Sequence, residues 1–164
     1  DGPSRGEFLR EVKQHAGARV VLGSGDLFTA RDCLAMIEYT GVDGVTAERG
    51  AIGNPWIFSQ ARALAAGQPL PDPPTLWQQR EVIAEHYRLA GERLGADRCL
   101  PGMRKVAIKY AQLHPQHAMV REDFCSVKQP GAWREVLAKW YGTDGPGVHP
   151  TVVEPNPLTL ERVA

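Results

Sequence analysis

The first third of the chain carries two short apolar runs, each followed by a glycine-rich segment. Val20–Leu22 is continuously apolar and rich in β-branched residues, and it stops at Gly23–Asp26. Such a run, bounded by turn residues, is typical of a strand in a parallel sheet. A second strand is expected over Gly44–Ala47, and it leads into the glycine loop Glu48–Gly53.

Helical patterns flank these strands. Arg5–His15 carries an apolar stripe at helical spacing, which predicts a helix before the first strand. Thr29 is expected to cap the next helix with Asp32 three residues on, and Gly41 to end it. A third helix is expected over 54–66, with asparagine as its cap and proline at its first position. The order strand, helix, strand, helix predicts an α/β region.

The second part of the chain has only helical patterns. Gly67–Pro74 contains four prolines and predicts a stiff, extended linker. Four helices are expected beyond it, namely Thr75–Leu94, Pro101–Leu113, Ala118–Val127 and one starting at Pro130. Short connections between helices of this length favour an antiparallel bundle. We therefore expect domains at 1–66 and 75–141, with a disordered tail at 142–164.

Composition narrows the class of protein. The chain has 164 residues, 43% of them hydrophobic, and a formal net charge of zero. It has no apolar run of membrane-spanning length, and its three cysteines form no C-x-x-C pair. These features predict a cytoplasmic protein with neither a membrane partner nor a metal site.

The charge is unevenly distributed along the sequence. From Arg98 to Lys139 there are eight basic residues against three acidic ones, so the segment carries +5 and the remainder carries −5. A basic face on the helical part is compatible with contacts to phosphate groups. The alternative is that these side chains are simply exposed to solvent on helix surfaces and bind nothing.

The two glycine loops are the strongest candidate for a site. Each exposes backbone N–H groups at the start of a helix, an arrangement that binds anions. Arg49 adds charged donors suited to a phosphate, whereas Asp26 is an acceptor suited to a hydroxyl or a loop amide. In (β/α)₈ barrels a phosphate commonly sits between the loops after the last two strands.

The motifs in and around these loops resemble flavin-dependent tRNA-dihydrouridine synthases. The resemblance rests on Gly23–Asp26, Asp43–Val45, Arg49–Phe58 and Gly102–Lys105, and it extends to about Tyr141. It implies the last βα units of a TIM (β/α)₈ barrel followed by a C-terminal helical bundle. Because a barrel has eight strands, we expect the two strands here to need a partner, either a missing N-terminal barrel portion or a second copy.

The resemblance also implies a cofactor and its ligands. By position, FMN would be held by Ser24, Gly25 and Asp26 in the first loop and by Glu48 and Arg49 in the second. Two positions depart from the family pattern. Ser24 replaces the usual asparagine, and Glu48 replaces the usual glycine, which adds a Cβ and a negative charge beside an anion.

The implied reaction is the NADPH-dependent reduction of uridine to dihydrouridine in tRNA. The family's catalytic cysteine matches none of the cysteines here, so we expect no catalytic residue and an inactive fragment. Arg104, Lys105 and Lys109, on one expected helix, would contact the RNA. Two alternatives remain open: a non-enzymatic RNA-binding or scaffolding remnant, and another phosphate-binding barrel enzyme.

Overall fold

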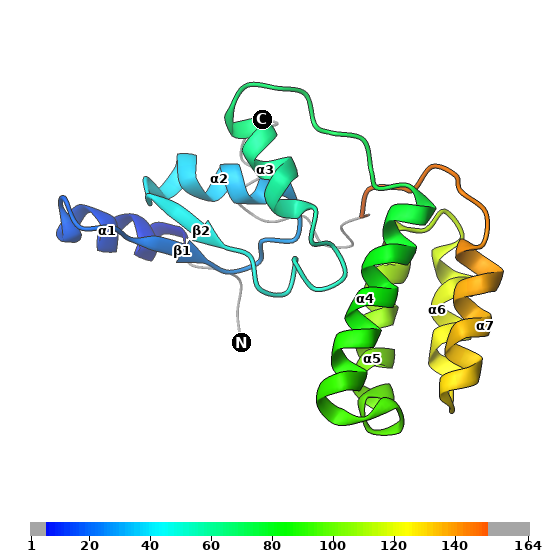
Figure 1. The fold of residues 1–164 in the computed structure, drawn as a ribbon. Helices are drawn as coiled ribbons and strands as arrows, with labels where there is room; N and C mark the ends of the chain where they lie inside the picture. The colour runs from blue at the N-terminus through cyan, green and yellow to red at the C-terminus, as the bar shows by residue number, and fades with distance from the viewer. Residues whose placement is uncertain (1–5, 151–164) are drawn as a thin grey trace. The chain divides into compact units, whose positions relative to one another are not determined.

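The computed structural model describes residues 6–150, which fall into two compact units (Figure 1). The first unit comprises residues 6–51 and 55–71, and the second comprises residues 52–54 and 72–150. The division along the chain therefore falls within the proline-rich segment expected to be a linker. The two units are described separately below.

The first unit contains two consecutive strand–helix pairs preceded by a helix. Its elements in order are α1 (Gly6–Ala16), β1 (Leu22–Ser24), α2 (Ala30–Thr40), β2 (Gly44–Thr46) and α3 (Ile57–Ala65). The strands are parallel, with Leu22 opposite Gly44 and Ser24 opposite Thr46. A small core packs beneath them, and α2 and α3 contribute Met36 and Ile57 to it.

The boundaries of α2 follow from local chemistry. Thr29 Oγ1 accepts the N–H of Asp32, and Asp32 Oδ2 accepts the N–H of Thr29, so the expected capping box is confirmed. At the other end, Gly41 adopts a left-handed conformation at φ 73° and donates its N–H to the Ile37 carbonyl. Glycine takes this conformation without steric penalty, and the helix ends there.

The first strand begins two residues later than its apolar run suggests. Gly23 pairs with Val45 and is buried, and a Cβ placed on it would lie 2.8 Å from the Met36 sulfur. The missing side chain lets α2 pack directly on the strand. Val20 and Leu22 are instead 76% and 57% exposed. The first strand thus keeps an open apolar surface, as expected for two strands that close no barrel.

An ion pair joins α1 to the start of β2. Lys13 Nζ lies 2.7 Å from Asp43 Oδ2 and also donates to the Arg19 carbonyl. Asp43 accepts the N–H of Val21 and donates its own N–H to the Val21 carbonyl. The Lys13 ammonium is the main cause of a lowered pKa at Asp43. These contacts fix the strand register at the amino ends of the strands.

The start of α3 differs from the expectation. The helix begins at Ile57 with Trp56 as its cap residue, and no side chain bonds its first amides. Asn54 was expected as the cap, but it is 1% exposed and neither polar atom of its side chain has a partner among the described residues. The Asn54 prediction is therefore wrong, because two turn residues separate the asparagine from the helix.

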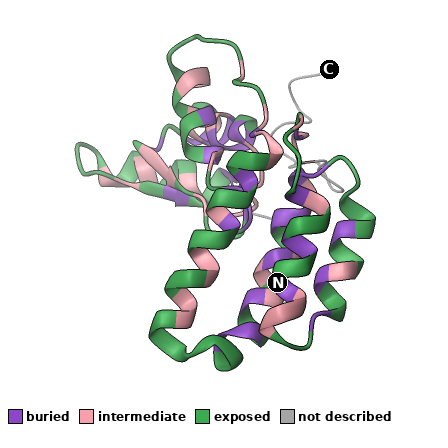
Figure 2. Ribbon diagram, turned by 45° about the vertical axis from the view of Figure 1, so that its right-hand side comes forward, coloured by how far each residue is buried: buried purple, intermediate pink, exposed green. Residues whose placement is uncertain are grey.

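The second unit packs four helices around one core. They are α4 (Leu76–Leu94), α5 (Ala96–Tyr110), α6 (His117–Ser126) and α7 (Pro130–Tyr141), with a 3₁₀ turn over Ala111–Leu113. Buried positions line the facing sides of the helices (Figure 2). Phe124, Trp133 and Tyr141 are the largest fully buried side chains of this core.

Helix α5 starts five residues earlier than its proline suggests. Gly95 ends α4 by donating to the Gly91 carbonyl, and α5 begins at once with Ala96, so Pro101 lies inside the helix. Proline removes one helical N–H but is tolerated where packing favours the helix. Here the early turns bury Cys99 and Leu100 in the core.

The segment after α7 is irregular but held in place as far as residue 150. Leu76 donates its N–H to the Gly145 carbonyl, and Val148 donates to the Leu113 carbonyl. Asp144 accepts the N–H of Trp77 at the start of α4. The disorder expected from residue 142 does not describe residues 142–150, and residues 151–164 of the expected tail lie outside the described range. None of the helices described over residues 6–150 is long and apolar enough to cross a membrane.

Candidate functional site

The two glycine loops of the first unit line one shallow pocket. It encloses about 300 Å³ of empty space, part of which is open solvent. It is formed at the carboxyl ends of both strands by Ser24, Gly25, Asp26, Leu27, Phe28, Thr46, Glu48, Arg49 and Gly50. All five residues expected to hold a cofactor therefore lie around one point.

Gly50 explains why the loops meet so closely. A Cβ at this position would lie 1.9 Å from the Leu27 carbonyl oxygen, which no real side chain could occupy. Only a residue without a side chain allows the second loop to rest on the backbone of the first. Asp32 stabilises the end of the first loop, since its carboxylate accepts hydrogen bonds from the N–H groups of Phe28 and Thr29.

Arg49 is held over the pocket from two sides. Its Nη2 lies 2.9 Å from Asp26 Oδ1, and its guanidinium carbon lies 5.4 Å from the centre of the Phe28 ring. The arginine side chain is nevertheless 66% exposed. Asp26 has φ 51°, a left-handed conformation that aspartate adopts more readily than most residues. Asp26 is thus an acceptor for Arg49 rather than a phosphate ligand.

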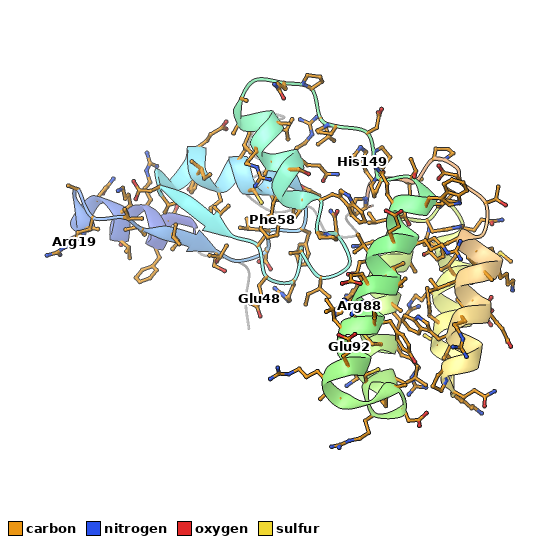
Figure 3. All side chains as sticks on the ribbon, in the orientation of Figure 1. Arg19, Glu48, Phe58, Arg88, Glu92 and His149 are labelled. Carbon is orange, nitrogen blue, oxygen red and sulfur yellow. The ribbon has the colours of Figure 1, made fainter. Side chains whose placement is uncertain are left out.

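Ser24 and Glu48 occupy the rim of the pocket. Ser24 Oγ points toward the Thr46 carbonyl at 3.5 Å, which leaves the hydroxyl exposed near the mouth. Glu48 is exposed, and its side chain projects away from the strands (Figure 3). Its carboxylate therefore does not fill the pocket, although its charge remains at the mouth.

The hydrogen-bond donors of the pocket suit an anion, but the net charge of the surrounding side chains does not. The pocket offers loop amides, the Ser24 hydroxyl and the Arg49 guanidinium, which are the groups that bind phosphate. Asp26 and Arg49 offset one another, so Glu48 leaves a formal charge of −1 around the site. The residues fit a phosphate in position and chemistry, and Glu48 opposes its binding electrostatically.

Sequence patterns did not reveal every residue of the pocket. Phe28 and Thr46 line it, and Phe28 supports the Arg49 guanidinium, yet neither belongs to a recognisable motif. The aromatic residue directly before the expected helix cap Thr29 was the available signal. Its meaning depends on a contact with a residue 21 positions later, which local patterns do not specify.

The cysteines and histidines form no second site in the part of the chain that the structure describes. Burial, with a smaller contribution from Asp32, raises the pKa of Cys33 to about 11, so this thiol stays protonated at neutral pH. Cys99 is also buried, whereas Cys125 is exposed. Between residues 6 and 150, no group of three or more potential metal ligands comes together.

The three expected RNA-contacting residues occupy different sides of α5. Lys105 and Lys109 are exposed, four residues apart on one face. Arg104 is half-buried, and its Nη1 donates to the Val127 carbonyl at 3.1 Å. The helix thus brings two of the three together, while Arg104 points toward the end of α6.

The arrangement in the first unit defines a class of protein. Consecutive parallel strand–helix units with a ligand pocket at the carboxyl ends of the strands are characteristic of α/β proteins that bind phosphate-containing ligands at that edge. The sequence model described as "Dihydrouridine synthase (Dus)" matches residues 5–140. The chain belongs to this family, which confirms the prediction drawn from its motifs.

Curated relatives support the same assignment. A "Probable tRNA-dihydrouridine synthase" of Mycobacterium tuberculosis is 36% identical over 127 residues, which cover 77% of this chain and 33% of the relative. A protein of the same name from Rickettsia prowazekii is 30% identical over 141 residues, covering 85% of this chain and 42% of the relative. The chain therefore spans between a third and somewhat under half of the length of these relatives.

Proposed function

We propose that the chain contributes the cofactor-phosphate cradle and an RNA-contacting helical unit to a tRNA-dihydrouridine synthase. The observation that carries the proposal is the convergence of both glycine loops, with Arg49 between them, on one pocket in a member of this family. The names of the curated relatives support tRNA as the substrate.

FMN is the cofactor proposed for the pocket. When bound, and reduced by NADPH, it would supply the hydride that reduces the 5,6 double bond of uridine. The chain's own residues act on the phosphate end. Ser24, Gly25 and the amides of the second loop would hold the phosphate, Arg49 would neutralise it, and Asp26 would keep Arg49 in place.

The pocket would work together with further strands. Two parallel strands do not close a barrel, and exposed apolar side chains lie just before β1, at Val20, and within it, at Leu22. We infer that strands from elsewhere, in the same polypeptide or another, complete the sheet and supply the proton donor. The 164-residue chain alone is then expected to bind ligands without reducing uridine.

Flavin binding tests the cradle directly. Titrating FMN with the purified chain and following flavin fluorescence gives the affinity. We expect Arg49→Ala to weaken binding about ten- to a hundredfold, because a hydrogen bond between charged groups is worth roughly 1.5–3 kcal/mol. Arg31→Ala, which removes an exposed arginine from α2, is the matched control and should bind like the wild type. Equal affinity of all three proteins would refute the cradle.

Glu48 permits a complementary gain-of-affinity test. Removing its charge should tighten FMN binding about fivefold, since an exposed charge a few ångströms from the phosphate opposes it by about 1 kcal/mol. Glu48→Gln removes only the charge, whereas Glu48→Gly also removes the Cβ. A larger gain for Gly than for Gln would show that close backbone approach matters as well.

Glu48 also favours a second candidate function. An acidic side chain at the mouth of an anion pocket suits a chain that has lost its cofactor and retains RNA binding alone. In that case FMN binds neither the wild type nor Glu48→Gly, while a tRNA transcript still binds in a gel-shift assay. If FMN binds and tRNA does not, another phosphate-binding enzyme becomes the better description.

A further inference from the structure

Helix α5 has a core side and an opposite side with distinct chemistry. At about 100° per residue, the buried residues cluster on one side of the helix, and these are Cys99, Leu100, Met103, Ala107 and Tyr110. Arg98, Gly102, Lys105 and Lys109 follow one another at intervals of four, three and four residues. By the same geometry they fall within an arc of about 60°, centred about 140° around the helix from the buried residues.

These four residues are here named the basic stripe. All four are exposed. With a rise of about 1.5 Å per residue, Arg98 and Lys105 lie about 10 Å apart along the axis, and Lys105 and Lys109 about 6 Å apart. A Cβ on Gly102 would meet nothing within 4 Å, so the middle of the stripe is open. The result is a row of cations with a flat gap on one helix face.

The charges of the stripe are not neutralised within residues 6–150. The ion pairs of this part of the chain use Lys13, Arg49, Arg88 and Lys139 as their cations, and none uses a residue of the stripe. Arg88 on α4 shows the contrast. It pairs with both Glu85 and Glu92 on its own helix, so its charge is offset locally (Figure 3).

Arg104 lies about 100° around the helix from Lys105, at the margin of the core. Its half-buried guanidinium donates to the carbonyl of Val127, the residue that follows α6. The main-chain oxygens at a helix end need donors, and Arg104 supplies one there. The role of Arg104 is therefore to hold the connection between α6 and α7.

We propose that the RNA backbone is contacted by the basic stripe, with Arg98 as a member, and that Arg104 is a positioning residue of the bundle. This inference rests on the proposed function, because it assumes that the chain binds tRNA. A row of exposed cations favours a phosphate backbone over a folded protein, since protein interfaces are centred on buried aromatic or apolar anchors. The open surface at Gly102 permits close approach of the ribose–phosphate chain.

The test compares salt dependence among variants of the full 164-residue chain. Affinity for an unmodified tRNA transcript is measured by fluorescence anisotropy at several salt concentrations. Replacing Arg98, Lys105 and Lys109 together by glutamine should weaken binding at least about tenfold. It should also make the slope of log affinity against log salt shallower by about two to three, because each lost phosphate contact removes roughly 0.7–0.9 from the slope.

Three further variants separate the inference from simple loss of charge or fold. Arg88→Gln removes one positive charge from an internally paired site, so its affinity and slope should match the wild type. Arg104→Gln should lower the melting temperature measured by circular dichroism and leave the salt slope unchanged. Gly102→Glu, which places an acid in the stripe, should weaken binding without lowering the helical content.

The outcomes distinguish the proposed function from the assignment of RNA contacts to the basic stripe. If the wild type does not bind tRNA, the proposed function fails and the stripe fails with it. If the wild type binds but the stripe variant keeps its affinity and slope, only the stripe is overturned. The stripe is also overturned if Arg104→Gln makes the salt slope shallower by as much as a single Lys105→Gln variant measured beside it. Equal binding of a duplex DNA of similar length would assign the stripe to polyanions generally and overturn its assignment to RNA.

Discussion

Single side chains decide whether the two loops of the first unit form a pocket. Gly50 allows the loops to touch, Asp26 and Phe28 hold Arg49, and Asp32 bonds the amides before α2. The contacts of Gly50 and Arg49 join residues more than 20 positions apart, whereas those of Asp32 are local. Small changes in side-chain volume should therefore have large effects there.

Replacing Gly50 with alanine is expected to force the loops apart. The new Cβ would overlap the Leu27 carbonyl, and overpacking of this kind destabilises a protein by about 1–3 kcal/mol. Urea unfolding and FMN titration should both show the loss. Gly131→Ala on α7 is the matched control, since a Cβ there meets nothing within 4 Å and should be neutral or stabilising. A Gly50→Ala protein with wild-type stability would contradict the observed loop contact.

The cap of α2 provides a second test at this scale. Thr29→Ala removes the acceptor for the Asp32 N–H, and loss of such a cap typically destabilises a protein by about 1 kcal/mol. Thr29→Ser keeps the hydroxyl and should restore most of the stability. Denaturant midpoints of the two variants give the comparison, and equal midpoints would mean that the capping box contributes nothing.

At the level of helices and loops, the sequence predicted what local chemistry controls. Thr29 was expected to cap a helix, and both Thr29 and Thr75 do so through complete capping boxes. Pro101 was expected to start a helix but lies inside one, because burial of its neighbours outweighs one missing hydrogen bond. Asp144 bonds a backbone amide 67 positions away, and no local pattern encodes such a contact.

The difference between local and long-range contacts also explains what the sequence predicted of the pocket and of α5. The five residues that the resemblance assigned to the cofactor all line one pocket, because a βα loop places its residues at the same sheet edge wherever it occurs. The sequence could not separate Arg104 from Lys105, since adjacent residues on a helix point in different directions and only the packing of α6 shows which one is engaged.

The connection after α5 gives the second unit a defined pH dependence. His114 is buried, its Nδ1 accepts the N–H of Gln116 at 3.0 Å, and its Nε2 lies 3.0 Å from the Trp140 carbonyl. Both contacts are satisfied by the neutral ring with its proton on Nε2. Burial lowers the pKa of His114 from its usual 6.5, despite the opposing effect of the Trp140 carbonyl.

Acid should therefore destabilise the second unit. Below pH 6.5 the unfolded chain binds a proton at His114 that the folded chain does not, so stability is complete above that pH and falls as the pH decreases toward the lowered pKa. Tryptophan fluorescence during urea unfolding between pH 8 and 5 would show this. The decline should be smaller in His114→Gln and unchanged in His117→Gln, where an exposed histidine is removed. An equal decline in all three proteins would assign it to other groups.

For the chain as a whole, the first unit exposes more apolar surface than a self-contained sheet would. Phe8, Val20 and Leu22 are each more than half exposed, and β1 pairs with a single strand among the described residues. An apolar strand with one unpaired edge is a template for association with another chain. This property belongs to the first unit, because the described part of the second unit contains helices and no strand.

Self-association of the purified chain is the expected consequence. Light scattering should show an apparent mass that rises with concentration, and Val20→Lys with Leu22→Lys should reduce that rise. Lysines at exposed positions of the second unit, such as Met119→Lys, serve as the control for added charge. A wild-type mass that stays at that of one chain over a hundredfold concentration range would contradict the expectation.

The ion pair between Lys13 and Asp43 bears on which residues of the chain can be substituted. It fixes the register at the amino ends of the strands, away from the loops at their carboxyl ends. Mouth residues such as Glu48 can thus be exchanged while the scaffold persists. A substitution at the mouth of the pocket can therefore change ligand binding while the strand register stays the same.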